Sequence, residues 1–107
     1  MSAGARTHVR KWYQEDWRFT LSVLRVGAQG RAEECRLGFE QGDTFEYTYE
    51  CPAGFCPKTL LKAFPLMEAV RSGGDLRNLG GSGAAEVVFV CPDGVVQFRL
   101  VGERIAS

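Results

Sequence analysis

The sequence has little histidine, no excess of either charge and no long apolar run, and each shortage argues against a class of protein. Its single histidine, His8, lies near the start of the chain, so a cysteine–histidine pair for acyl transfer lacks an obvious base. Thirteen basic residues balance thirteen acidic ones, which gives no electrostatic reason to expect nucleic acid or an anionic membrane as a partner. No apolar segment has the length of a membrane span or the form of a secretion signal, and we expect a cytoplasmic protein.

What is present is the composition of a folded domain. Of the 107 residues, 45% are apolar and 24% are charged, which are ordinary values for a globular chain with one core. Residues 1–15 have the composition of a flexible lead-in. We expect residues 16–107 to form a single domain.

Hydrophobic periodicity predicts four strands and one helix. Strands show apolar and polar residues in alternation, whereas a helix repeats apolar residues every three or four positions. The predicted order is strand, strand, helix, strand, strand, at residues 17–26, 44–50, 57–72, 87–91 and 95–101. Pro65 lies inside the helix and is expected to kink or divide it, because proline removes one backbone hydrogen bond. The prediction is an α+β fold, a small four-stranded mixed sheet with one kinked helix packed on one face.

The segment 73–83 carries five glycines and is predicted to be a loop. A glycine-rich phosphate cradle lies between a strand and the start of a helix. This segment instead follows the predicted helix and precedes a strand, which argues against phosphate binding and leaves its role open.

The four cysteines are the main candidates for chemistry. In the cytoplasm disulfides are usually reduced, so cysteines there are first thiols, metal ligands or redox partners. Cys51 and Cys56 flank the point where a strand pattern stops and a helix pattern starts. Pro57 suits the first helical position, which places Cys56 at the start of the helix. Free backbone N–H groups and the helix dipole favour a thiolate there.

The cysteines are expected to converge if the second and third strands are parallel neighbours. The helix between those strands is then a right-handed crossover, and its start lies at the same edge as the ends of both strands. Cys51, Cys56 and Cys91 would meet at this edge. Cys35 lies on a loop long enough to add a fourth ligand.

Such a cluster has three uses, and the sequence leaves all of them open. Four thiolates can bind zinc in a structural site or an iron–sulfur cluster, although the spacing lacks the tight runs of ferredoxins. Alternatively, Cys56 is the activated thiol of a redox or nucleophilic enzyme, with Cys51 or Cys91 as its resolving partner. In the third reading the thiols are simply buried in an interaction module. A redox or metalloenzyme partner protein and a homo-oligomer through a sheet edge also stay open.

Several segments taken together carry a resemblance. They are Cys35 with Gly38, Gly42-Asp43-Thr44-Phe45, Pro52-Ala53-Gly54-Phe55-Cys56-Pro57, Phe64-Pro65 before Gly73-Gly74, Cys91-Pro92-Asp93-Gly94 and Val96-Gln97-Phe98-Arg99-Leu100. This combination, over about residues 19–104, resembles a family of small uncharacterised bacterial and archaeal proteins often found in anaerobes. The resemblance implies no established activity. It implies a shared site, because all four cysteines fall where members tend to carry cysteine. The chain departs at Gly80–Gly83, where relatives usually carry an acidic or aromatic stretch.

Overall fold

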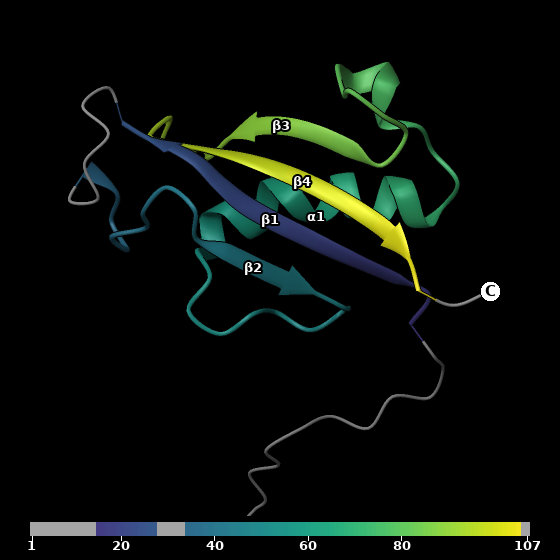
Figure 1. Cartoon of the computed structure of the whole chain (residues 1–107), viewed down its shortest axis with the longest axis horizontal. Coiled ribbons are helices and arrows are strands. Elements are labelled where there is room, and N and C mark those ends of the chain that lie inside the picture. Colours follow the sequence, from purple (N-terminus) through teal and green to yellow (C-terminus); the bar gives the residue numbers. More distant parts are fainter. Residues whose placement is uncertain (1–14, 28–33, 106–107) are drawn as a thin grey trace, which may run out of the picture.

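The chain forms a four-stranded sheet with one long helix, which confirms the predicted α+β fold (Figure 1). The computed structural model describes residues 15–27 and 34–105. Its elements, in chain order, are β1 (Trp17–Val26), β2 (Thr44–Tyr47), α1 (Pro57–Arg71), the short 3-10 helix η2 (Leu76–Leu79), β3 (Glu86–Val90) and β4 (Val96–Arg104). Most of the predicted lead-in lies outside the described residues.

The order of the strands differs from the predicted one. The sheet runs β2-β1-β4-β3, and every neighbouring pair is antiparallel. The prediction of a mixed sheet with β2 and β3 as parallel neighbours was therefore wrong. The physical reason is the hairpin after β3, which turns β4 back and lets it pair with β1 from Trp17 to Val26. This long ladder occupies the centre, so β2 and β3 lie at opposite edges.

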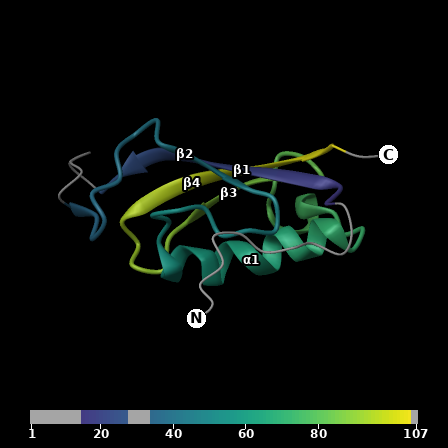
Figure 2. The same cartoon turned by 90° about the horizontal axis from the view of Figure 1, so that it is seen from below.

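The helix covers one face of the sheet, as Figure 2 shows from the side. The core lies between these layers, where the alternation of β1 points Phe19, Leu21 and Val23 inward. Phe98 of β4 is 0% exposed, and burial of such a side chain stabilises the fold by about 1.5–3 kcal/mol. The register of β1 shifts between Val23 and Arg25, and after this shift Val26 also lies in the core.

The helix begins and ends close to the predicted residues. Cys56 is its N-cap, with extended backbone, and Pro57 occupies the first turn. Pro65 does not divide the helix, which continues to Arg71. The face packed on the sheet buries small and flexible apolar side chains, among them Ala63 and Met67.

The second strand is shorter than predicted. It ends at Tyr47 instead of Glu50, because Tyr49 adopts a positive φ of 64° and turns the chain away from the sheet. A non-glycine residue in this region of backbone space is uncommon. The segment that follows Tyr49 runs back to the start of α1.

The glycine-rich segment has a structural explanation. It contains η2, which the sequence did not predict, and Gly80 ends this short helix at a φ of 87°. A Cβ at Gly81 would lie 2.3 Å from the carbonyl oxygen of Glu86 and 2.8 Å from that of Leu76. Gly81 therefore allows the loop to pass close to η2 and β3.

The outer edge of the sheet at β3 is covered at its two ends. The backbone of Glu86 exchanges hydrogen bonds with Gly83, at 3.3 and 3.5 Å, and the Val90 carbonyl accepts one from Lys62 Nζ at 2.7 Å. Lysine and short local pairings are devices that protect an edge strand. A homo-oligomer through a sheet edge stays a prediction.

Candidate functional site

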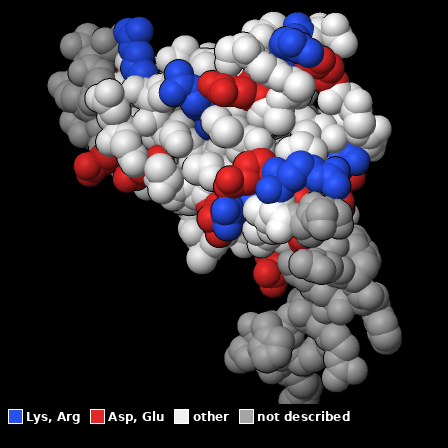
Figure 3. Space-filling view, turned by 45° about the vertical axis from the view of Figure 1, so that its right-hand side comes forward, with Lys and Arg blue, Asp and Glu red and all other residues white. Residues whose placement is uncertain are grey.

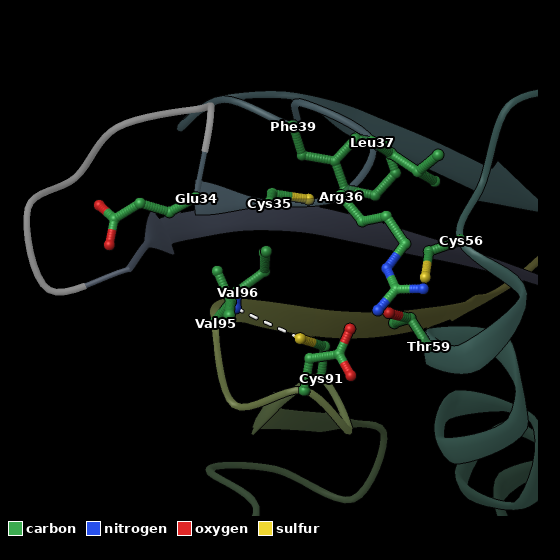
Figure 4. Close-up of a pocket in the computed structure, with 11 residues that line it drawn as sticks. Glu34, Cys35, Arg36, Leu37, Phe39, Cys56, Thr59, Cys91, Val95 and Val96 are labelled. Atoms are coloured by element: carbon green, nitrogen blue, oxygen red, sulfur yellow. Dashed lines mark hydrogen bonds between the residues drawn. The ribbon is translucent and has the colours of Figure 1, made fainter.

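A cleft of about 380 Å³ opens at the start of α1. Figure 4 shows that three segments surround it: the loop that precedes β2, the first turn of α1, and the turn between β3 and β4. Each segment contributes one cysteine, namely Cys35, Cys56 and Cys91. The walls between these thiols are mainly apolar, from Leu37, Phe39, Val95 and Val96.

The half-buried Cys56 has the features of a reactive thiol. Burial acts to raise its pKa, but the Thr59 hydroxyl and the backbone N–H groups of Thr59 and Lys58 lower it by more, so the net pKa is below the ordinary value. Lys58 and Thr59 are the second and third residues of α1. An N-cap side chain normally accepts a hydrogen bond from the N–H group of one of these two positions. The Cys56 side chain itself makes no capping hydrogen bond. The arrangement therefore makes the thiolate of Cys56 easier to form than that of an ordinary cysteine.

Cys91 faces the cleft from the other side and is buried. It directly follows β3, and the backbone N–H of Val96 donates to its Sγ at 3.3 Å. In Figure 4 this contact is the dashed line between the two residues. The sulfur is therefore held at a defined place in the turn.

The other two cysteines differ in position. Cys35 is half-buried and lines the cleft from the loop before β2. Cys51 is exposed and does not belong to the lining; its charge acts on Tyr47, at the end of β2. The structure thus brings Cys56 and Cys91 to one cleft together with Cys35, which was expected as an additional ligand, whereas Cys51 lies outside the lining. Their approach comes from the return of the chain after β2, and not from parallel strands.

The described residues contain no group of three or more histidine, cysteine, aspartate or glutamate side chains that could hold a metal ion. The three thiols of the cleft surround a space instead of meeting at one point. A zinc or iron–sulfur site formed by Cys35, Cys51, Cys56 and Cys91 stays a prediction.

Residues that the sequence reasoning passed over also shape the cleft. Lys58 Nζ lies 2.9 Å from Asp93 Oδ1, and the charge of Asp93 acts to raise the pKa of Cys56. Arg36 extends its guanidinium into the cleft (Figure 4). The position of Thr59, three residues after the N-cap, is a local signal that could have identified it as a neighbour of Cys56, because a capping box places its partner at this position. The roles of Asp93 and Arg36 depend on distant segments and had no such signal.

No family model, curated protein or solved structure matches the chain. The resemblance to an uncharacterised family stays a prediction.

In the part of the chain that the structure describes, no helix is long and apolar enough to cross a membrane. On the face shown in Figure 3, lysine and arginine lie among aspartate and glutamate and form no large region of one sign. The surface seen there reflects the equal numbers of basic and acidic residues in the chain.

Proposed function

We propose that this is a thiol-dependent protein in which Cys56 attacks a small electrophilic molecule bound in the cleft. One observation carries the proposal: the N-cap cysteine of α1 has a lowered pKa and opens onto a cleft with two further thiols. A thiolate, not a thiol, is the nucleophile in such chemistry.

The cleft supports a small-molecule substrate. Its volume, about 380 Å³, lies within the range of small-molecule sites. The buried Phe39 gives the cleft an apolar wall, and the guanidinium of Arg36 supplies a positive charge that would orient an anionic group of the substrate. The substrate class that fits is a small, partly apolar electrophile with a negative charge.

The test is the rate of alkylation of each cysteine by iodoacetamide as a function of pH, read by mass spectrometry of peptides. Cys56 is expected to react with an apparent pKa below that of an unperturbed thiol. The exposed Cys51 serves as an internal comparison, and Cys51→Ser should leave the profile of Cys56 unchanged. A Cys56 profile at or above the ordinary pKa would mean that the cysteines are idle and would remove the proposal.

The metal hypothesis is tested on the same preparation. Zinc and iron content is measured by elemental analysis, with an absorption spectrum, on protein purified without oxygen or chelators. Close to one metal per chain, lost together with stability on chelation, would make the cysteines ligands. Four titratable thiols and no metal would leave Cys56 available as a nucleophile.

A further inference from the structure

The segments that carry Cys56 and Cys91 are joined by an ion pair. Lys58 lies two residues after Cys56, and Asp93 lies two residues after Cys91, and their side chains meet at 2.9 Å. Asp93 also acts electrostatically on Cys56, so the turn after β3 lies close to the first turn of α1. The ion pair therefore holds the two thiols on facing sides of one cleft.

Cys91 has what a second thiol needs. Its Sγ accepts the backbone N–H of Val96, and such a donor stabilises the thiolate during attack. The side chain is buried within the cleft. A bulky reagent in solution therefore reaches the Cys91 sulfur less easily than a mixed disulfide that has already formed on Cys56 does. These features suit attack on a mixed disulfide inside the cleft.

The other cysteines are less suited to this role. Cys51 is exposed and lies outside the cleft lining. Cys35 lines the cleft from the loop that precedes β2, whereas the ion pair of Lys58 and Asp93 directly joins the segments that carry Cys56 and Cys91.

We propose that Cys91 is the resolving partner of Cys56, and that the cleft carries out thiol–disulfide exchange with a small-molecule disulfide bearing an acidic group. This inference rests on the proposed nucleophilic role of Cys56. It adds the substrate class and assigns the second thiol.

The reaction has two displacement steps. The Cys56 thiolate attacks one sulfur of the substrate, so that a Cys56–substrate disulfide forms, the substrate S–S bond breaks and one thiolate leaves. Cys91 then gives its proton to solvent and attacks the Cys56 sulfur, which forms the Cys56–Cys91 disulfide and expels the second thiolate. The substrate gains two electrons and the cysteine pair loses two. A dithiol reductant returns the pair to thiols by the reverse exchange.

Bond formation requires the two segments to approach. A disulfide needs Cα atoms within about 7 Å of each other, and the turn from Cys91 to Val96 is the segment that would move. This turn is held by the Gly94 N–H to Cys91 carbonyl bond at 2.8 Å and by the ion pair to Lys58. The first contact keeps Cys91 within the turn, and the ion pair keeps the turn next to the start of α1.

The experiment uses dithiobisnitrobenzoate, a small anionic disulfide that releases a coloured thiolate. The protein is the full chain with Cys35→Ser and Cys51→Ser, which leaves only the proposed pair. The expected result is rapid release of two thiolates per chain, with no reagent left on the protein by intact mass. Adding Cys91→Ser should halve the release and leave one reagent group bound to Cys56.

The two proposals fail in different ways. If one or two reagent groups stay bound while Cys91 is present, the resolving role is overturned and the nucleophilic role of Cys56 stands. If release is no faster than in a Cys56→Ser variant, the proposed function itself is overturned. If the Cys35→Ser, Cys51→Ser protein folds poorly, the Cys51→Ser single variant is treated with dithiobisnitrobenzoate and then digested without reduction. A Cys56–Cys91 peptide then supports the inference, and a Cys35–Cys56 peptide overturns it.

Discussion

The two ends of α1 carry groups of opposite charge in different surroundings. At its start, the thiol of Cys56 lies beside N–H groups and a hydroxyl and opens onto a cleft. At its end, Arg71 is largely enclosed: it pairs with the buried Glu15 and with Glu68, and lies 4.7 Å from the centre of the Tyr49 ring. Both placements suit the helix dipole, which favours a negative group at the start and a positive group at the end.

The difference lies in what surrounds each charge. The groups that lower the pKa of Cys56 lie on one side of a residue that also lines the cleft. Arg71 instead connects α1 to Glu15, two residues before β1, so its charge serves stability. We infer that one helix separates a reactive end from a structural end.

The largest expected effect comes from breaking the structural end. Arg71→Met leaves the buried carboxylate of Glu15 without its partner, and removing one member of a buried pair costs about 3–5 kcal/mol of unfolding free energy. Denaturant unfolding measures the loss. Lys58→Met is the matched control at the other end, where the pair with Asp93 is exposed and its loss should be small. Equal losses in the two variants would contradict the contrast.

Alkaline pH should also act on the structural end. Burial, followed by the charges of Tyr49, Cys51 and Glu68, raises the pKa of Tyr47 to about 12. The phenol loses its proton more readily when unfolded, near its usual value of about 10. The stabilising effect is complete below about pH 10 and is lost as pH rises towards about 12.

Tyr47→Phe isolates this effect. The variant should show a shallower fall in unfolding free energy over this alkaline range, measured by denaturant titration at each pH. Tyr49→Phe, at an exposed ring, is the control and should keep more of the fall. A Tyr47→Phe profile that follows the original protein would show that other groups cause the alkaline loss.

Local signals explain why the start of α1 could be predicted. Pro57 after Cys56, and the helical spacing that follows, specify a helix N-terminus without reference to the rest of the chain. The same holds for β1, where Phe19, Leu21 and Val23 alternate as they do in the structure.

The order of the sheet could not be predicted in this way. It depends on how well β4 pairs with a distant β1, and no local pattern records that pairing. The cleft has the same limitation, since Cys35 and Cys91 reach it only through the global path of the chain. The positive φ of Tyr49, which sends Cys51 away from the cleft, also had no signal, because glycine or asparagine is the usual residue in that conformation.

At the reactive end, Thr59→Val should raise the pKa of Cys56. The change keeps the shape of the side chain and removes the hydroxyl that favours the thiolate. Folding lowers this pKa, so the thiolate of Cys56 stabilises the fold above its ordinary pKa, and this stabilisation is lost as pH falls through the lowered value. Thr59→Val should weaken this pH dependence of the unfolding free energy. The alkylation profile of Cys56 measures the shift, with Thr44→Val on the exposed edge of β2 as control. An unchanged profile would mean that the hydroxyl has no role.

The smallest effects separate charge from geometry at this end. Asp93→Asn removes a carboxylate that disfavours the thiolate, so the pKa of Cys56 should fall further. Lys58→Met breaks the same ion pair but removes the lysine charge and keeps the carboxylate of Asp93, so the pKa of Cys56 should rise. Opposite shifts of the alkylation profile would show that charge controls the thiol. Shifts in the same direction would mean that the ion pair acts by holding the turn after β3 against α1, because both variants lose that contact equally.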